Sequence, residues 1–236
     1  LLLVESLTDL TPAIERYHTL VGLGRYDDAF VLFRDRLNRA TLYRLAAHWE
    51  RVEWLERLFP QGVEARPAID GAREQSFMLN ALALSYQFSG QPGRAASVLR
   101  RVSEIAEKGH HERNLQIGLI NLGAALLAAG ALKEAEKNLK RAIGLARGRQ
   151  DVFSEASGLL GLGHVYATRD ADESGVTLRR ALPMFADETK HQSQGVALAF
   201  LAARSLWSGE FAQAHCFAER SWLLAHERRH ERDFVR

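Results

Sequence analysis

The sequence predicts an all-α fold, a right-handed superhelical solenoid built from helical hairpins that stack on one another. Three observations predict this fold. Apolar residues recur at helical spacing, similar positions return about every 40 residues, and no segment shows the apolar–polar alternation of a strand. Glycines also stand where each pair of helices would have to reverse.

The period is clearest at a small residue that follows a leucine in the first helix of each pair. This residue is Ala83, Gly123, Gly163 or Ala202, with steps of 40, 40 and 39. The turn positions 90, 130, 170 and 209 have the same steps, and all but Asp170 are glycine. A small side chain lets a neighbouring helix approach closely, and glycine adopts the positive φ that ends a helix. Asp170 therefore predicts a differently built turn.

A second amphipathic helix follows each of these turns. It is expected over residues 94–108, 133–147, 173–186 and 212–229. Because one hairpin cannot bury the apolar stripes of both its helices, neighbouring hairpins must stack, and the first helices then line a concave face.

The first 75 residues depart from this period. Tyr17, Gly24, Ala29 and Phe33 fit a hairpin more loosely. An amphipathic helix ending before Pro60 is predicted from Leu42, Leu45, Trp49, Val52, Leu55 and Phe59. We expect three parts: an N-terminal hairpin over residues 1–40, an inserted helix and connecting loop over 41–75, and four repeats over 76–236.

This pattern resembles the tetratricopeptide repeat (TPR). It is matched most fully by Leu122-Gly123, Gly130, Ala135, Leu139 and Ala142. The period exceeds the usual length of about 34 residues, so the resemblance is to the long-repeat type. It implies that the chain binds a protein, a peptide or a small effector in its concave groove.

The residues expected to line this groove are mainly apolar, with several amides and aromatic rings. They are Asn80, Leu84, Gln87, Phe88, Asn121, Ala124, His164, Phe200 and Trp207. Amides that pair with backbone groups and aromatic rings that supply buried area suit a partner helix or an extended apolar segment. The alternative is that these side chains fill a tightly wound superhelix or pack against a neighbouring domain. The groove lacks the Lys and Arg with which chaperone-binding relatives grip a terminal carboxylate.

The composition argues against a nucleic-acid partner. With 31 Lys+Arg against 29 Asp+Glu, the chain has too little net positive charge to drive nucleic-acid binding. The opening Leu1-Leu2-Leu3-Val4 is too short to span a membrane, so we expect a cytoplasmic location. The one cysteine, Cys216, excludes a disulfide framework and is interpreted as a buried thiol.

A first residue other than Met indicates a piece of a longer chain. The long repeats resemble the sensor region of bacterial signal-transducing NTPases of the NB-ARC, MalT-like or STAND class. That resemblance implies a non-enzymatic regulatory module beside an NTPase domain, without a cofactor of its own. The alternative is a free-standing TPR adaptor whose groove holds a partner helix or peptide.

Three clusters of charged or ligating residues are candidate sites. His226, Glu227 and His230 match the HExxH pattern of a zinc hydrolase, a remote alternative because no third ligand follows before the last residue. A polar face of a terminal helix explains them better, and the His110-His111 pair reads as a solvated loop, so no metal is expected. A basic outer stripe that would face an acidic partner is formed by Arg101, Arg141, Arg180 and Arg220, and its alternative is a solvated face compensated by nearby glutamates.

Overall fold

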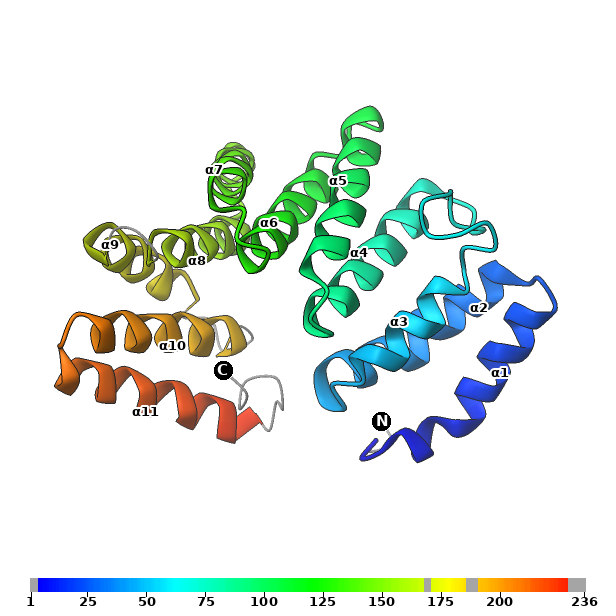
Figure 1. The fold of residues 1–236 in the computed structure, drawn as a ribbon, viewed down its shortest axis with the longest axis horizontal. Helices are drawn as coiled ribbons and strands as arrows, with labels where there is room; N and C mark the ends of the chain where they lie inside the picture. Colours follow the sequence, from blue (N-terminus) through cyan, green and yellow to red (C-terminus); the bar gives the residue numbers. More distant parts are fainter. Residues whose placement is uncertain (1–3, 168–170, 186–190, 229–236) are drawn as a thin grey trace. The chain divides into compact units, whose positions relative to one another are not determined.

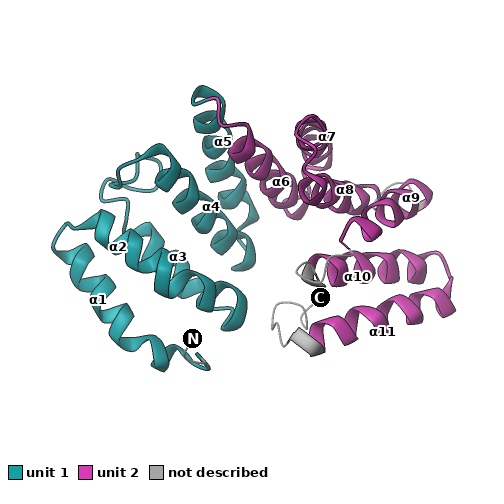
Figure 2. Cartoon of the chain, turned by 180° about the vertical axis from the view of Figure 1, so that it is seen from behind, with its two compact units in different colours: residues 1–109 teal, residues 110–236 magenta. Residues whose placement is uncertain are grey.

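The computed structural model describes residues 4–167, 171–185 and 191–228. Throughout these residues the chain consists of helices and their connections, without a strand, which confirms the predicted all-α solenoid of hairpins. It divides into two compact units, Leu1–Gly109 and His110–Arg236 (Figure 2).

Unit 1 contains two helical hairpins and a connecting helix (Figure 1). The turn of its first hairpin contains Gly24 at φ 70° and that of its second contains Gly90 at φ 80°, as the sequence predicts. In chain order its elements are the 3-10 turn η1 (Leu7–Leu10), α1 (Thr11–Gly22), α2 (Tyr26–Leu32), the π-helical turns η2 (Phe33–Leu37) and η3 (Ala40–Arg44), α3 (His48–Glu56), α4 (Ala72–Phe88) and α5 (Pro92–Lys108).

The single helix predicted from Leu42 to Phe59 is wrong. The π-helical turn η3 ends at Arg44 and α3 begins only at His48, with Ala46 at φ 47° between them. A non-glycine residue in the left-handed region interrupts a helix and resets the direction of the residues that follow. Trp49, which was expected on the buried stripe, is therefore 65% exposed.

A buried arginine lies at the centre of unit 1. Arg51 on α3 is fully buried and lies over the ring of Phe33, with its guanidinium carbon 5.2 Å from the ring centre. Its guanidinium donates to the backbone and side-chain oxygens of Asn38, at 2.8 and 2.9 Å, and to the Oγ1 of Thr41 at 2.9 Å. A further hydrogen bond reaches the Oγ of Ser85 at 3.1 Å. One side chain thus links the π-helical segment, α3 and α4.

Unit 2 contains three hairpins, each contacting the next along the chain. Gly130 at φ 78° and Gly209 at φ 74° form the turns of its first and third hairpins, while the turn at Asp170 lies outside the described residues. The elements of unit 2 are α6 (Glu112–Ala128), α7 (Leu132–Gly148), α8 (Val152–Ala167), α9 (Ala171–Ala181), the 3-10 turn η4 (Leu182–Phe185), α10 (His191–Trp207) and α11 (Phe211–Arg228).

The repeated small residue lies where two helices of one hairpin meet. A Cβ at Gly123 would lie 2.5 Å from the Cγ of Leu139 on α7, and one at Gly163 would lie 2.7 Å from the Cγ of Leu178 on α9. Since both leucines are fully buried, neither can move away easily. The predicted reason for a small residue at this position is confirmed.

The second helix predicted over residues 173–186 ends early. The α-helical part, α9, stops at Ala181 and continues as the 3-10 turn η4. Pro183 explains the change, because it lacks the N–H that an α-helix needs and its ring crowds the preceding turn. Among the described helices, none combines the length and apolar character required to cross a bilayer.

Candidate functional site

Five of the residues predicted to line a groove lie on the first helices of the hairpins of unit 2, and we call the surface that they form the inner face of this unit. They are Asn121, Ala124, His164, Phe200 and Trp207. They lie on α6, α8 and α10, which are the first helices of three successive hairpins and contact one another in that order. The rings of His164 and Phe200 are 4.0 Å apart between centroids, which joins α8 to α10. Asn121, Ala124, His164 and Phe200 are half-buried, whereas Trp207 at the end of α10 is 69% exposed.

The inner face of unit 1 contains the other four: Asn80, Leu84, Gln87 and Phe88, all half-buried on α4. The Phe88 ring lies 5.1 Å from the ring of His48 on α3. Asn80 donates from Nδ2 to the backbone oxygen of Ser76 at 2.9 Å, within its own helix. The side-chain oxygen of Gln87 is buried and accepts no hydrogen bond from the described residues.

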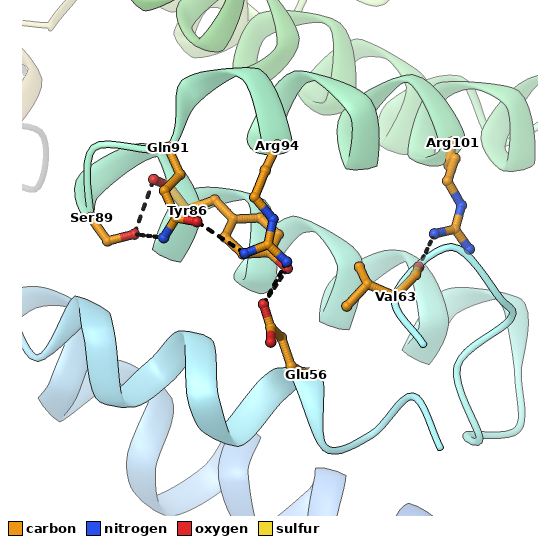
Figure 3. A network of polar contacts seen from close by, with 7 residues as sticks. All are labelled: Glu56, Val63, Tyr86, Ser89, Gln91, Arg94 and Arg101. Atoms are coloured by element: carbon orange, nitrogen blue, oxygen red, sulfur yellow. Dashed lines mark hydrogen bonds and ion pairs between the residues drawn. The ribbon is translucent and has the colours of Figure 1, made fainter. Parts of the chain in front are cut away.

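A polar network fixes α4 beside this face (Figure 3). Glu56 on α3 accepts hydrogen bonds from the Tyr86 hydroxyl at 2.6 Å and from Arg94 at 2.8 Å, and the Arg94 guanidinium carbon lies 4.1 Å from the centre of the Tyr86 ring. Burial and the hydrogen bond to the Glu56 carboxylate raise the pKa of Tyr86 well above its ordinary value, so its hydroxyl remains a donor. Three helices are thus joined at one carboxylate.

The four arginines of the predicted basic stripe have different surroundings. Arg101 is half-buried and donates to the backbone oxygen of Val63 (Figure 3). It also donates to the backbone oxygen of Ala65, and the two hydrogen bonds secure the loop before α4. Arg180 lies 3.4 Å from the carboxylate of Glu155. Arg141 and Arg220 are exposed on α7 and α11. Arg101 therefore has a structural role, and the other three arginines of the predicted stripe are exposed on unit 2.

The structure describes only part of the HExxH pattern, in which His226 and His230 could have held a metal. The ring of His226 is stacked on Trp222, with centroids 5.0 Å apart and planes 12° apart. His230 lies outside the described residues, and so do the side chains of Glu227 and Arg228. In the part of the chain that the structure describes, no three His, Cys, Asp or Glu side chains gather as metal ligands.

An apolar hollow of about 530 Å³ lies between α10 and α11, at the end of unit 2. Sequence reasoning missed it, and we call its lining the end face. Its lining is Ala199, Ala202, Ala203, Leu206, Phe211, Ala214, His215, Ala218, Ser221, Trp222 and Ala225.

The repeat itself carried a signal for the end face. The position that holds Leu139 and Leu178 in the two preceding hairpins, at steps of 39 and 40, holds Ala218 in the last one. A small residue at a position where the preceding hairpins have a core leucine leaves unfilled space, and Ala218 lines the hollow. Cys216, also on α11, was expected to be buried but is exposed, because little of this helix is covered.

Comparisons with known proteins give likeness of fold alone. No protein-family model matches the chain, and no curated protein matches it. A solved structure of BtubC (BKLC) from P. vanneervenii has a TM-score of 0.60 at 18% identity, and the match covers 94% of this chain and 90% of that one.

Two further solved structures have the same kind of fold. A Rap protein complexed with Competence and Sporulation Factor has a TM-score of 0.72 at 17% identity, covering 95% of this chain and 60% of that one. A putative kinesin light chain with TPR-like repeats from Podospora anserina has a TM-score of 0.50 at 15% identity, covering 94% and 96%. The chain is therefore built of TPR-like helical repeats.

Proposed function

We propose that this chain is a non-enzymatic recognition module that binds a protein or peptide segment on the inner face of unit 2. One observation carries the proposal: a highly exposed tryptophan, Trp207, stands on the same face as the half-buried His164–Phe200 ring pair. Large aromatic side chains with exposed area dominate the affinity of protein interfaces. Ala124, on α6 of the preceding hairpin, adds a small half-buried residue to this face.

The fold supports this kind of function. A stack of hairpins holds its first helices in fixed register, so a rigid surface is available before binding and less entropy is lost on association. The similar Rap structure holds that protein in complex with Competence and Sporulation Factor.

Binding is tested with peptides selected against the full chain from a displayed random library. Trp207→Ala should lower the affinity for the selected peptides by about tenfold or more, which is the loss expected when an interface aromatic is truncated. Asn121→Ala should weaken them less. Trp49→Ala is the matched control, because Trp49 is equally exposed but lies on α3 of unit 1. Equal losses for the two tryptophans would refute the assignment of this face.

We further propose that the module is the sensor region of a larger bacterial signal-transducing NTPase. The long, 40-residue period supports this context by its resemblance to such regions. A sensor should change the NTPase rate of the full-length protein when its peptide is added, and Trp207→Ala should remove that response. An adaptor, the alternative, would bind the same peptide without any change in an NTPase. A full-length chain without a nucleotide-binding domain would exclude the sensor proposal.

A further inference from the structure

One side of α7 presents only positive charge to solvent. The exposed residues of this helix are two glycines and five cations, and none of them is acidic. The five cations are Lys133, Lys137, Lys140, Arg141 and Arg147. Their helical spacing places them on one side of α7, over a length of about 21 Å. We call these five residues, together with Gly144 and Gly148, the cationic face.

The same side of α5, the second helix of the preceding hairpin along the chain, has mixed charge. At the positions where α5 has the exposed residues Glu104 and Glu107, α7 has Gly144 and Arg147, 40 residues later. Solvated protein surfaces normally mix both signs, whereas a field of one sign attracts a partner of the opposite charge. The repeat thus shows that α7 lacks the two carboxylates that balance this side of α5.

A shared carboxylate orients two arginines at one end of the cationic face. Oε1 of Glu155 on α8 lies 2.7 Å from Arg147 and 3.4 Å from Arg180 on α9. The Glu155 side chain is only 15% exposed, whereas both arginines are about half exposed. One carboxylate between two guanidiniums leaves one positive charge in excess. Because both guanidiniums are already held in place, they lose less entropy when they bind an anion.

Gly144 lies near the middle of the cationic face, and no packing contact explains a glycine there. Nothing lies within 4 Å of a Cβ built at Gly144, whereas a Cβ at Gly123 or Gly158 would meet a core side chain. Glycine inside a helix is less stable than alanine, so the fold by itself favours a larger residue. The bare backbone instead lets another chain approach closely, between Lys140 and Arg147 one turn away on either side.

Charge and shape favour an acidic protein segment as the occupant. The half-buried residues Glu134 and Glu136 flank the cationic face on its two sides, and their carboxylates would repel the broad phosphate surface of a nucleic acid. The face offers no apolar side chain to insert into a lipid surface. Residues 229–236 of this chain, which lie outside the described part, contain three arginines against two carboxylates and have the wrong charge to cover it.

We propose that the cationic face of α7 is a docking site for an acidic segment of a partner protein. The segment lies along α7 and pairs its Asp and Glu side chains with the lysines, while Arg147 and Arg180 bind one of its carboxylates. Gly144 allows the segment to lie close to the helix. The inner face belongs to the first helices of the hairpins and α7 is a second helix, so the two sites are separate.

The test measures binding of two synthetic peptides to the chain by fluorescence anisotropy. Both peptides have about 18 residues, enough to span the face as a helix, and carry either Glu or Gln at every third or fourth position in alanine. The Glu peptide should bind at least about tenfold more tightly than the Gln peptide at low salt, and added salt should reduce the difference. Equal affinities at low salt would overturn the proposal.

Three variants locate the binding, and circular dichroism checks that each is folded. Lys137→Glu should lower the affinity for the Glu peptide by about tenfold, because it places a like charge on the cationic face. Lys108→Glu makes the same change at an exposed lysine of α5 and should bind nearly normally. Equal losses would show that only net charge attracts the peptide, which contradicts a site on α7. Gly144→Leu changes no charge and should also weaken binding, and a normal affinity would refute close docking.

Other outcomes identify a different occupant. If generic double-stranded DNA or anionic lipid vesicles bind more tightly than the Glu peptide, and Lys137→Glu but not Lys108→Glu removes that binding, the face binds phosphates and the proposal is wrong. If the full-length protein does not bind the Glu peptide although residues 1–236 do, a segment of the same protein covers the face, which also overturns the proposal. Trp207→Ala should leave binding of the Glu peptide unchanged, because Trp207 belongs to the inner face.

Discussion

Asp151 is a small example of how single side chains fix this stack. It directly precedes α8, where Oδ1 accepts a hydrogen bond from the Ser154 backbone N–H at 3.1 Å. Oδ2 accepts from the Ser154 hydroxyl at 2.8 Å and from Nε2 of Gln116 on α6 at 3.0 Å. Burial by itself raises the pKa of Asp151, but these hydrogen bonds outweigh it and hold the pKa below its ordinary value.

Asp151→Ala should lower the free energy of unfolding by about 1 kcal/mol at neutral pH, the usual loss for a helix cap. A carboxyl whose pKa is lowered on folding stabilises the fold above its unfolded pKa, near 3.8, and this contribution disappears as the pH falls through the folded value. The difference from the parent chain should therefore shrink below pH 3.8. Urea titrations at several pH values measure it, and the difference between Asp151→Asn and Asp151→Ala should not change with pH, because neither variant titrates at this position.

Arg51→Met should destabilise the chain by about 2 kcal/mol or more, because buried oxygens lose a donor that nothing replaces. The methionine retains part of the apolar stem against Phe33, so the loss reports on the hydrogen bonds. Arg36→Met is the matched control on the exposed side of η2 and should change stability little. Urea denaturation of both variants gives the comparison, and similar losses would contradict a special role of Arg51.

At the scale of helices, substitution by alanine should change the stability of the chain in opposite directions at two glycines of one hairpin. A Cβ at Gly123 on α6 meets Leu139, whereas nothing lies within 4 Å of a Cβ at Gly144 on α7. Gly123→Ala should destabilise the chain by about 1–3 kcal/mol through overpacking. Gly144→Ala should stabilise it by about 0.5–1 kcal/mol through helix propensity. Thermal unfolding measures both, and a stabilising Gly123→Ala would contradict the close approach seen here.

The hairpins and their turns could be predicted from the sequence because their signals are local. A glycine such as Gly130 ends a helix through its own backbone freedom, and a leucine stripe reports on the same helix that carries it. The break at Ala46 had no such signal. Alanine favours a helix, and the tertiary contacts of Arg51 and the π-helical turns override that preference.

The role of α3 was also beyond the sequence pattern. Tyr86 donates to Glu56 on α3, and Tyr166 donates to Glu136 on α7, and the partners are 30 positions apart in both pairs. α3 therefore packs against α4 in the same way as α7 packs against α8. In that second pair, α7 is the second helix of one hairpin and α8 is the first helix of the next. The apolar pattern did not reveal this, because α3 contains none of the alanines that recur in the later second helices.

The inner-face residues were found by position, but their surroundings were not. Periodicity places His164 and Phe200 on first helices, and only the structure shows that their rings meet across two hairpins. The end face depends on which neighbours pack against α10 and α11. The apolar pattern within a helix does not show what packs against it. That is why Cys216 was expected to be buried although it is exposed.

For the whole molecule, the contacts predict local unfolding. Contacting elements belong to the same hairpin or to adjacent ones along the described chain. Stability in such a stack is a sum of local terms, so damage should stay local. Arg51→Met should accelerate hydrogen exchange in α3 and α4 while leaving α8 to α10 unchanged. Exchange followed by mass spectrometry measures this, and uniform acceleration across both units would show that the chain opens as a single body.

The exposure of Cys216 makes the molecule convenient to observe. It is the sole cysteine of the chain, it is exposed on α11, and it follows His215 of the end face directly. A maleimide dye therefore attaches at one known position without any engineered residue. Fluorescence from that dye would report occupancy beside the hollow in real time, in the native sequence.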